Sequence, residues 1–303
     1  MRPKIVIVGI SGESIFLKTD HFHRSGETIN AYEKHTEPGG KGYNQAAAAA
    51  KFGADVTFLT TVGDDFYGKY AVEYLENKGI NVKYRIVKNV QTAYAVILTD
   101  KEGNNEVTVF SGASSYLTEQ DVLSIEDEIK NADYILLQLE VKNEVLAKTL
   151  ELAEKYNVKV VLNPAPARLG TNHSFYEKVD VLTPNEIELK DIYEVPSTLS
   201  YLEYGEYLKN IVKKTLIVTL GSNGCLLVQP NYYKYFHPLK VDVVDTTGAG
   251  DIFNAGLVTM LSFNKNIEEA IDFAIVSSAL SVTKPYVMDA IPTLEEVNEK
   301  SGI

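Results

Sequence analysis

The sequence contains a single cysteine and no long apolar run. Cys225 cannot form a disulfide within the chain, so a reducing compartment is expected, and its place in the apolar run 225–228 predicts a buried, unreactive thiol. The apolar run 5–10 is too short for a signal peptide or a membrane span. These features predict a cytoplasmic protein with a strand near its start.

Basic side chains are scarce relative to acidic ones. The 303 residues include 29 Lys and Arg against 41 Asp and Glu, which gives a formal net charge of -12. Nucleic acids and anionic membranes repel such a field, so neither is expected as a partner. The composition, 45% hydrophobic and 23% charged, is typical of a globular protein with a large core. No repeat, low-complexity tract or linker is visible, so residues 1–303 are expected to form one domain.

Short apolar runs alternate with helix-like segments such as 143–157 and 201–214. Because these runs are continuous, they predict strands buried on both faces of an α/β fold, with a doubly wound, mostly parallel sheet flanked by helices. The expected strands are 4–9, 56–63, 134–139, 158–163, 179–185, 215–221 and 225–228. Two stretches have the pattern of β hairpins, and they predict a small β-sheet lid inserted at about 13–37 and 91–111. In such sheets, ligands bind beyond the carboxyl ends of the strands.

The stretch Gly-Ala-Gly-Asp at 248–251 runs directly into an apolar, helix-like segment that ends near Leu261. A turn of small residues before a helix exposes free backbone amides at the positive end of the helix dipole, which forms a site for an anion. Asp251 is then either the N-cap of this helix or a base held beside a phosphate. The residue type alone is compatible with both roles.

A second glycine-rich stretch, PGGKGYNQAAAAAKFG at 38–53, predicts a tight loop and a helix that packs closely on a sheet and ends at Gly53. Asn44 and Gln45 fall in the first turn of this helix. The alternative is a glycine-rich turn with no role beyond packing. The spacing differs from that of a Walker loop, and GISGES at 9–14 lacks the glycine spacing of a dinucleotide-binding turn.

Taken together, these two stretches resemble the two signatures of the ribokinase family of carbohydrate kinases. The segments VGDDFYG (62–68), LNPAPA (162–167), TPNEIEL (183–189) and VTLGSNG (218–224) lie between them in the order of that family. The resemblance extends nearly end to end. It implies a ribokinase-like fold and a kinase that transfers the γ-phosphoryl group of ATP to a hydroxymethyl group of a small sugar, ribose or a related pentose.

The resemblance also implies roles for individual residues. Asp251 corresponds to the base that takes the proton from the sugar hydroxyl, and the amides of Gly248, Ala249 and Gly250 correspond to the hole for charge on the transferring phosphoryl group. The positions that correspond to sugar contacts, besides Asp251, are Gly12, Ser14, Gly40, Asn44 and Glu140.

On the nucleotide side, the resemblance implies contacts with ATP from Asn185, Thr219, Gly221 and Gly224. Glu188 corresponds to the residue that orders Mg²⁺ through water, since a metal that keeps most of its waters needs few protein ligands. Asp245 and Thr247 correspond to positions associated with a monovalent cation such as K⁺. The exposed edges of a β lid also predict a homodimer formed through the lid.

The chain departs from the family at three places. Ser14 stands where ribokinases carry an aspartate that holds sugar hydroxyls, and Glu13, one residue away, is a candidate replacement. Near the C-terminus the family has a small-residue run of the type Gly-Ala-Gln-Pro-Ser, whereas here Tyr286 and Ala290 stand at the positions linked to the cation, which leaves K⁺ dependence open. Ile275 replaces a polar residue beside the adenine, so nucleotide preference stays open too.

Two other functions are compatible with the sequence. A related kinase for another sugar or a nucleoside is favoured by the loss of the carboxylate at position 14. A sugar sensor without turnover is disfavoured, because it would not need Asp251, Asn185 or Glu188. Three histidines, at 21, 23 and 35, lack the additional ligands of a metal site, and they are expected on a solvated face of the lid.

Overall fold

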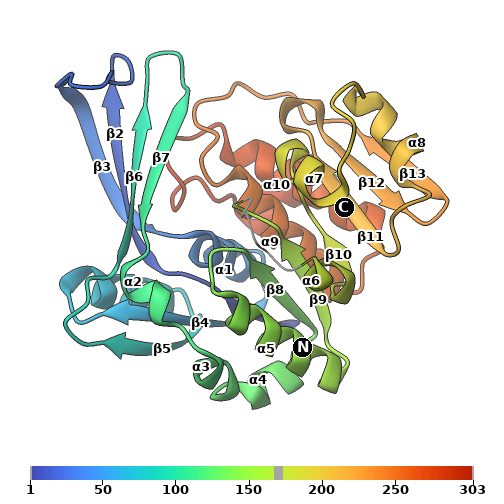
Figure 1. The fold of residues 1–303 in the computed structure, drawn as a ribbon, viewed down its shortest axis with the longest axis horizontal. Coiled ribbons are helices and arrows are strands. Elements are labelled where there is room, and N and C mark those ends of the chain that lie inside the picture. The colour runs from blue at the N-terminus through green and yellow to red at the C-terminus, as the bar shows by residue number, and fades with distance from the viewer. Residues whose placement is uncertain (1, 167–172, 302–303) are drawn as a thin grey trace.

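A nine-stranded sheet with helices on both faces forms the body of the protein (Figure 1). The computed structural model describes residues 2–166 and 173–301, so Ala167, the last residue of the segment 162–167, lies outside the described residues. The strand order is β13-β12-β11-β10-β9-β8-β1-β4-β5, and every neighbouring pair is parallel except β11 with β12 and β12 with β13. The strands are β1 (Lys4–Val8), β4 (Asp55–Gly63), β5 (Asn81–Val87), β8 (Tyr134–Gln138), β9 (Lys159–Asn163), β10 (Val181–Leu182), β11 (Thr215–Thr219), β12 (Cys225–Gln229) and β13 (Tyr232–Phe236). This arrangement confirms the predicted doubly wound fold.

Each face of the sheet carries its own hydrophobic cluster. Along β1, Ile5 and Ile7 contribute to one cluster and Val6 and Val8 to the other, as the two-residue period of a strand requires. The first face is covered by α1 (Lys41–Lys51), α2 (Phe66–Glu76), α9 (Ala249–Ser262), α10 (Ile267–Ser281) and α11 (Leu294–Ser301). The second face is covered by α3 (Glu119–Leu123), α4 (Glu126–Lys130), α5 (Asn143–Tyr156), α6 (Ser174–Lys178), α7 (Glu186–Tyr193) and α8 (Tyr204–Leu208).

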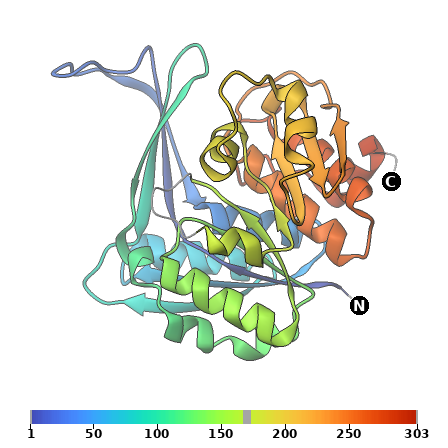
Figure 2. The same ribbon diagram turned by 45° about the vertical axis from the view of Figure 1, so that its right-hand side comes forward.

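A separate four-stranded sheet stands away from one side of the body, as both ribbon views show (Figures 1 and 2). We call it the lid. It consists of β2 (Gly12–Thr19), β3 (Ala31–Gly39), β6 (Ala93–Thr99) and β7 (Asn105–Phe110), in the order β3-β2-β6-β7. The two antiparallel hairpins are joined by a parallel pairing of β2 with β6. These strands coincide with the two predicted hairpins.

Three details differ from the sequence-based expectations. β5 and β13 were not expected, because both are edge strands with mostly exposed or half-buried side chains and so lack a continuous apolar run. The helix expected over 201–214 is a 3₁₀ turn followed by the short α8. There Gly205 packs against a ring of β13, since a Cβ at this position would lie 2.3 Å from Tyr233. The chain then turns toward β11.

Cys225 is buried as predicted, and burial raises the pKa of its thiol. Of the described helices, none combines the length and apolar character that a membrane span requires.

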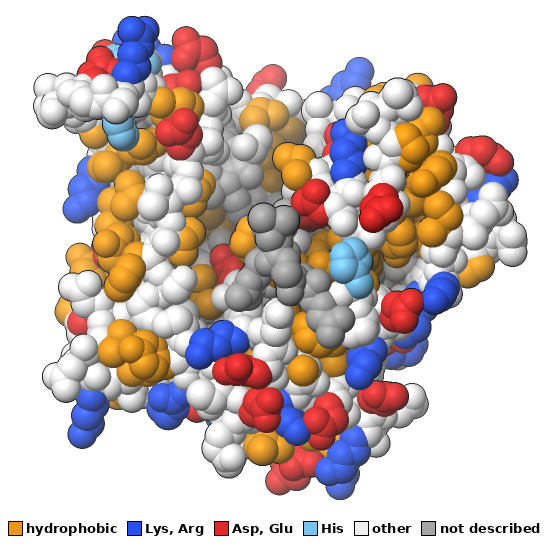
Figure 3. All heavy atoms as spheres, in the orientation of Figure 1, with side chains coloured by type: hydrophobic (Ala, Val, Ile, Leu, Met, Phe, Trp, Pro, Cys, Tyr) orange, Lys and Arg blue, Asp and Glu red, His pale blue; other side chains and the backbone are white. Residues whose placement is uncertain are grey.

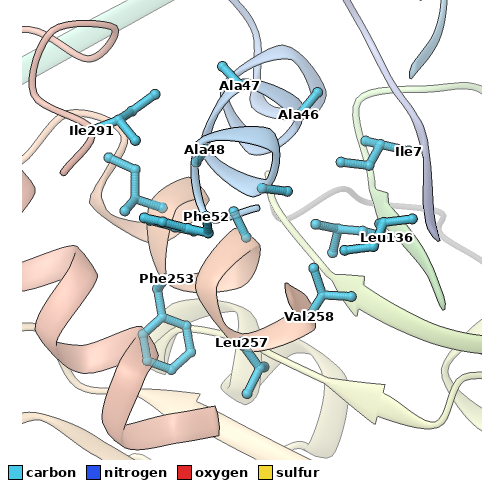
Figure 4. Packing of buried hydrophobic residues seen from close by; sticks show 14 of the residues in the cluster. Ile7, Ala46, Ala47, Ala48, Phe52, Leu136, Phe253, Leu257, Val258 and Ile291 are labelled. Atoms are coloured by element: carbon cyan, nitrogen blue, oxygen red, sulfur yellow. The ribbon is translucent and has the colours of Figure 1, made fainter. Parts of the chain in front are cut away.

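The small side chains of α1 allow close packing against α9, which packs in turn against α10. Ala46, Ala48 and Ala49 are fully buried, and Phe52, just past the end of α1, fills the space between these helices (Figure 4). The ring of Phe52 meets that of Phe273 edge to face, with centroids 5.2 Å apart. This packing fixes the position of α1 relative to α9, and the first turns of these two helices meet at the site described below.

We expect Phe52→Ala to lower the free energy of unfolding by about 3–5 kcal/mol, because it removes a fully buried ring between two helices. Phe66→Ala is the matched control, since Phe66 is 72% exposed and its loss should change stability by less than about 0.5 kcal/mol. Urea denaturation of both variants measures the difference. Equal effects would contradict the packing role of Phe52.

Candidate active site

The predicted site residues converge at the carboxyl ends of the central strands. β1, β8, β9 and β11 end at this edge of the sheet, and the first turns of α1 and α9 lie beside them. The space-filling view shows the surface hollowed between the lid, at the upper left, and the opposite half of the molecule (Figure 3).

Helix α9 begins at Ala249, with Gly248 as its N-cap in a left-handed conformation (φ 74°) and no side-chain cap. Asp251 therefore lies within the first turn, and the interpretation of Asp251 as an N-cap is wrong. The amide of Ala249 donates to the carbonyl of Thr246 (3.2 Å), whereas those of Gly248 and Gly250 have no partner among the described residues. Two free amides at a helix N-terminus suit an anion.

The carboxylate of Asp251 is held by two side-chain amides from the first turn of α1. Asn44 Nδ2 donates to Oδ2 at 2.8 Å, and Gln45 Nε2 donates to Oδ1 at 3.1 Å. Asp251 is only 6% exposed, and burial raises its pKa above the usual range of an aspartate. The charge of Lys41 and the two amides oppose this rise. A buried carboxylate with a raised pKa, in reach of an anion site, suits a general base.

Lys41, the first residue of α1, lies among three carboxylates from other parts of the chain. Burial alone would lower the pKa of its ammonium, but the charges of Asp251, Glu140 and Glu188 raise it overall. The backbone amide of Lys41 also donates to Glu140 Oε2 at 2.9 Å. No role was predicted for Lys41, although it lies in the stretch 38–53. The signal that marks this residue is a single cationic side chain inside a glycine-rich loop.

Glu140 follows the end of β8, on the side of the site next to Lys41. Burial raises its pKa to about 7, the ammonium of Lys41 opposes this shift, and the negative charge of Asp251 adds to it. Glu140 therefore exchanges its proton near neutral pH, which allows it either to donate or to accept a hydrogen bond.

Adjacent residues of β2 face opposite sides of the lid. Ser14 faces the site: a Cβ added at Gly39 would lie 2.2 Å from Ser14 Oγ and 3.8 Å from Asn44 Oδ1. Glu13 faces away and hydrogen-bonds Tyr67 of α2. Glu13 thus does not replace the carboxylate missing at position 14, because the period of the strand turns it to the other face.

Asn44 carries an unused acceptor. Its Oδ1 is buried and has no hydrogen-bond partner among the described residues, while its Nδ2 is committed to Asp251. Buried polar atoms are normally paired, so a donor from a bound ligand would complete this site.

Two of the predicted glycines are required by the chain itself. A Cβ at Gly12 would lie 2.5 Å from the carbonyl oxygen of Ala93, where two lid strands pair. Gly40 is the N-cap of α1 at φ 112°, and a Cβ there would lie 2.8 Å from the carbonyl oxygen of Ile10. Both glycines lie beside the site, but close backbone approach accounts for them.

Asn185 and Glu188 form a capping box at the start of α7. Asn185 Oδ1 accepts from the amides of Ile187 and Glu188 (both 2.9 Å), and Glu188 Oε2 accepts from the amide of Asn185 (2.9 Å). The Asn-x-x-Glu spacing is typical of such a capping box, so this helix start could have been predicted from the sequence. Glu188 is buried, which raises the pKa of its carboxyl, and its Oε1 has no partner among the described residues.

Thr219, at the end of β11, forms an isolated bridge with Asn185. Gly221 follows at φ 54°, and a Cβ there would meet nothing within 4 Å, so it borders open space. Gly224 differs: at φ 89°, a Cβ would lie 2.1 Å from the carbonyl oxygen of Phe236, so the turn into β12 explains this glycine.

Asp245 holds the loop before α9. Its Oδ1 accepts from the amide of Thr247 (2.9 Å) and its Oδ2 from that of Tyr286 (3.0 Å). The hydroxyl of Thr247 is buried and has no hydrogen-bond partner in the described part of the chain. Nearby, Glu37 of the lid accepts from the amides of residues 287 and 288, which connects β3 to the segment beside Gly248. No pattern in the sequence predicts this contact.

The histidines do not come together. His21 pairs with Glu27 at 3.1 Å, while His35 stacks on Tyr286 with ring centroids 3.8 Å apart. Within residues 2–166 and 173–301, no group of three or more His, Cys, Asp or Glu could hold a metal ion.

A doubly wound sheet with a β lid thus places one buried carboxylate beside free helix-terminal amides, an arrangement that suits phosphoryl transfer to a small molecule. Residues 2–294 match the model of the pfkB family carbohydrate kinases.

The chain is 35% identical over 305 residues to a ribokinase of Staphylococcus aureus, with 99% of this chain and 100% of that protein covered. It is 32% identical over 299 residues to a deoxyribokinase of Salmonella typhi, with 97% of each covered. The solved structure of an Arabidopsis thaliana ribokinase complexed with ribose and ATP superimposes with a TM-score of 0.87 at 28% identity, covering 100% of both chains. The chain therefore belongs to the pfkB family of carbohydrate kinases.

Gly250→Ala should separate catalysis from stability. A Cβ at Gly250 meets nothing within 4 Å, so the variant should keep or slightly raise the melting temperature while its methyl group obstructs the anion site and lowers kcat roughly 10²-fold. Gly248→Ala is the contrasting variant, because φ 74° and a Val287 contact at 2.8 Å should destabilise it. Thermal melts and a coupled kinase assay measure both. Full activity in Gly250→Ala would show that the open space is not used.

Proposed function

We propose that the protein is an ATP-dependent pentose kinase in which Asp251 is the catalytic base. The observation that carries this proposal is the buried carboxylate of Asp251 in the first turn of α9. It is fixed by the side-chain amides of Asn44 and Gln45 of α1. It lies beside the backbone amides of Gly248 and Gly250, which have no partner among the described residues. The relatives named ribokinase and deoxyribokinase, and the related structure that contains ribose and ATP, support a pentose and ATP as the substrates.

The chemistry follows from these positions. Asp251 accepts the proton of the sugar hydroxymethyl group, and the oxygen of that hydroxyl attacks the γ-phosphorus of ATP. The bond from this phosphorus to the β,γ-bridging oxygen breaks, which releases ADP. The free amides of Gly248 and Gly250 and the charge of Lys41 stabilise negative charge on the transferring group. The base lies in the same turn as the amides, so positioning supplies much of the rate.

Sugar hydroxyls are expected to bind between the lid and α1. Asn44 Oδ1 is the unpaired acceptor at this point, Glu140 exchanges its proton near neutral pH, and Ser14 Oγ faces the same space. The missing side chain of Gly40 does not make room for the sugar, since a Cβ there would meet the carbonyl oxygen of Ile10, so a contact from Gly40 would come from its backbone. The lid would close over the bound sugar and exclude water.

The nucleotide is expected beside Asn185, Thr219 and the open space at Gly221. Mg²⁺ fits here with Glu188 acting through water, because the buried carboxylate has one oxygen without a partner among the described residues. When bound, Mg²⁺ neutralises phosphate charge. Gly224 is not part of this proposal, since its turn explains it.

A monovalent cation is not part of the proposal either. Both oxygens of Asp245 accept backbone amides, which supports a role in holding the loop rather than an ion. We propose a cytoplasmic homodimer formed through the lid, on the grounds that a sheet standing away from the body exposes its edge strands, β3 and β7. A sugar sensor without turnover is disfavoured by the retained base.

Asp251→Asn should leave folding and sugar binding intact and lower kcat by roughly 10² to 10⁴, the usual contribution of a positioned base. A coupled assay, titration calorimetry with the sugar and a thermal melt measure these quantities. Asp272→Asn on α10 is the control, because the same change outside the site should leave kcat unchanged. Activity of Asp251→Asn within about threefold of wild type would remove Asp251 from the mechanism.

Ser14→Asp should raise kcat/KM on ribose. A carboxylate that accepts hydrogen bonds from sugar hydroxyls contributes about 1.5–3 kcal/mol, or roughly 10- to 150-fold, and a serine hydroxyl supplies less. If the natural substrate is another sugar or a nucleoside, activity on it should fall in the same variant. Both proteins are compared on ribose, 2-deoxyribose and a panel of sugars and nucleosides.

Glu13→Gln provides the control, because Glu13 faces Tyr67 and should not affect selectivity. The proposal for position 14 is wrong if wild type already prefers ribose by a hundredfold and Ser14→Asp weakens that preference.

A further inference from the structure

We propose that Gln138 acts through Gln45 to fix the carboxylate of Asp251, so that the two glutamines form a positioning pair behind the base. This inference rests on the proposed function, in which Asp251 is the base. Neither glutamine needs to touch the substrate.

The pair forms a continuous chain of hydrogen bonds. Gln138 Nε2 donates to Gln45 Oε1 at 2.5 Å, and Gln45 Nε2 donates to Asp251 Oδ1 at 3.1 Å. Both glutamine side chains are fully buried. Gln138 is the last residue of β8, so the chain of bonds connects the central sheet to the first turn of α9 through α1.

The direction of each bond is determined by Asp251. An ionised carboxylate only accepts, so Gln45 must present its NH₂ group to it, and Gln45 Oε1 must then point toward Gln138. Asn163 agrees with this direction: its Nδ2 donates to the carbonyl of Thr183 (3.4 Å), which leaves Oδ1 to accept from Gln45 Nε2 (3.3 Å). Gln138 therefore holds the amide of Gln45 in the orientation that the base requires.

The last member of the chain has an unpaired oxygen. Gln138 Oε1 is buried without a hydrogen-bond partner among the described residues. Only small residues leave room for it, since a Cβ at Gly9 would lie 2.7 Å from this oxygen and a Cβ at Gly42 would lie 3.0 Å from it. Leucine or methionine would fill such a strand position without an unpaired atom. A buried glutamine there is best explained by what its NH₂ group does.

The charges that face Asp251 make a neutral donor useful. The positive charge of Lys41 lowers the pKa of Asp251. The negative charges of Asp251 and Glu140 repel each other, and Glu188 of α7 also interacts with the ammonium of Lys41. The amide of Gln45 stabilises the carboxylate without adding a further charge. Loss of that donor should raise the pKa of Asp251.

The test compares Gln45→Met, Gln138→Met and the double variant with wild type in pH profiles of kcat/KM. Gln45→Met should move the acidic limb to higher pH by about one unit, because a carboxylate without this donor binds its proton more tightly. At pH values below the midpoint of the limb, kcat/KM should then be roughly tenfold lower than in wild type. Gln138→Met should shift the limb in the same direction by less. The double variant should match Gln45→Met, since Gln138 acts only through Gln45.

Gln229→Met is the matched control. Gln229 is a half-buried glutamine at the end of β12 that donates to Thr215 Oγ1 of β11 (3.1 Å), outside the site, and its loss should leave the limb unmoved. An unmoved limb in Gln45→Met and Gln138→Met overturns the inference, as does a double variant whose shift is the sum of the two. A fall in kcat that is uniform with pH also overturns it, because packing alone would then explain the pair.

If the methionine variants fail to fold, Gln138→Glu decides the question. While protonated, its hydroxyl can donate to Gln45 Oε1, but once ionised it cannot, so activity should fall as pH rises through the pKa of the new carboxyl. No such fall overturns the inference. Full activity of Asp251→Asn would overturn the proposed function itself, whereas an inactive Asp251→Asn with unmoved limbs in the glutamine variants would overturn only the pair.

Discussion

The candidate site depends on how one carboxylate is held in the protein interior. Asp251 is nearly inaccessible, and burial favours its protonated form. The compensating groups, Lys41, Asn44 and Gln45, all come from the first turn of α1. The run of alanines that follows allows α1 to approach α9 closely enough for these contacts. The position of the Asp251 carboxylate is thus determined by the packing of two helices rather than by its own loop.

The glycines of the site serve two different purposes. Gly9 and Gly42 are required by neighbouring atoms of the protein, because a Cβ at either position would collide with Gln138 or with the other glycine. Gly250 and Gly221 border open space, where a side chain would meet a ligand instead of the chain. Sequence alone does not separate these two kinds of glycine, since both follow a strand or precede a helix. The distinction requires the positions of atoms far away in the chain.

The sequence predicted most of the sheet and both lid hairpins, because continuous apolar runs and turn residues are local signals. That 38–53 and 248–251 serve one site was implied by the resemblance to the ribokinase family, because no local pattern shows that two distant segments meet. It missed β5 and β13, whose exposed side chains reflect their edge positions. It also left open the role of Asp251 and the direction of Glu13, which depend on the residue where a helix begins and on the face of a strand. Gln138 gave no signal, because an amide at the end of a strand belongs to no motif.

The proposed chemistry and the proposed selectivity occupy different parts of the molecule. Asp251, Lys41 and the amides of Gly248 and Gly250 lie on helices anchored in the main core, where a change disturbs packing. Ser14 lies on β2, whose partners among the described strands are β3 and β6 of the lid. A substitution at position 14 therefore leaves Asp251 and the side-chain amides that hold it in place. This separation allows the contacts proposed for the sugar to change without a change in the residues proposed for phosphoryl transfer.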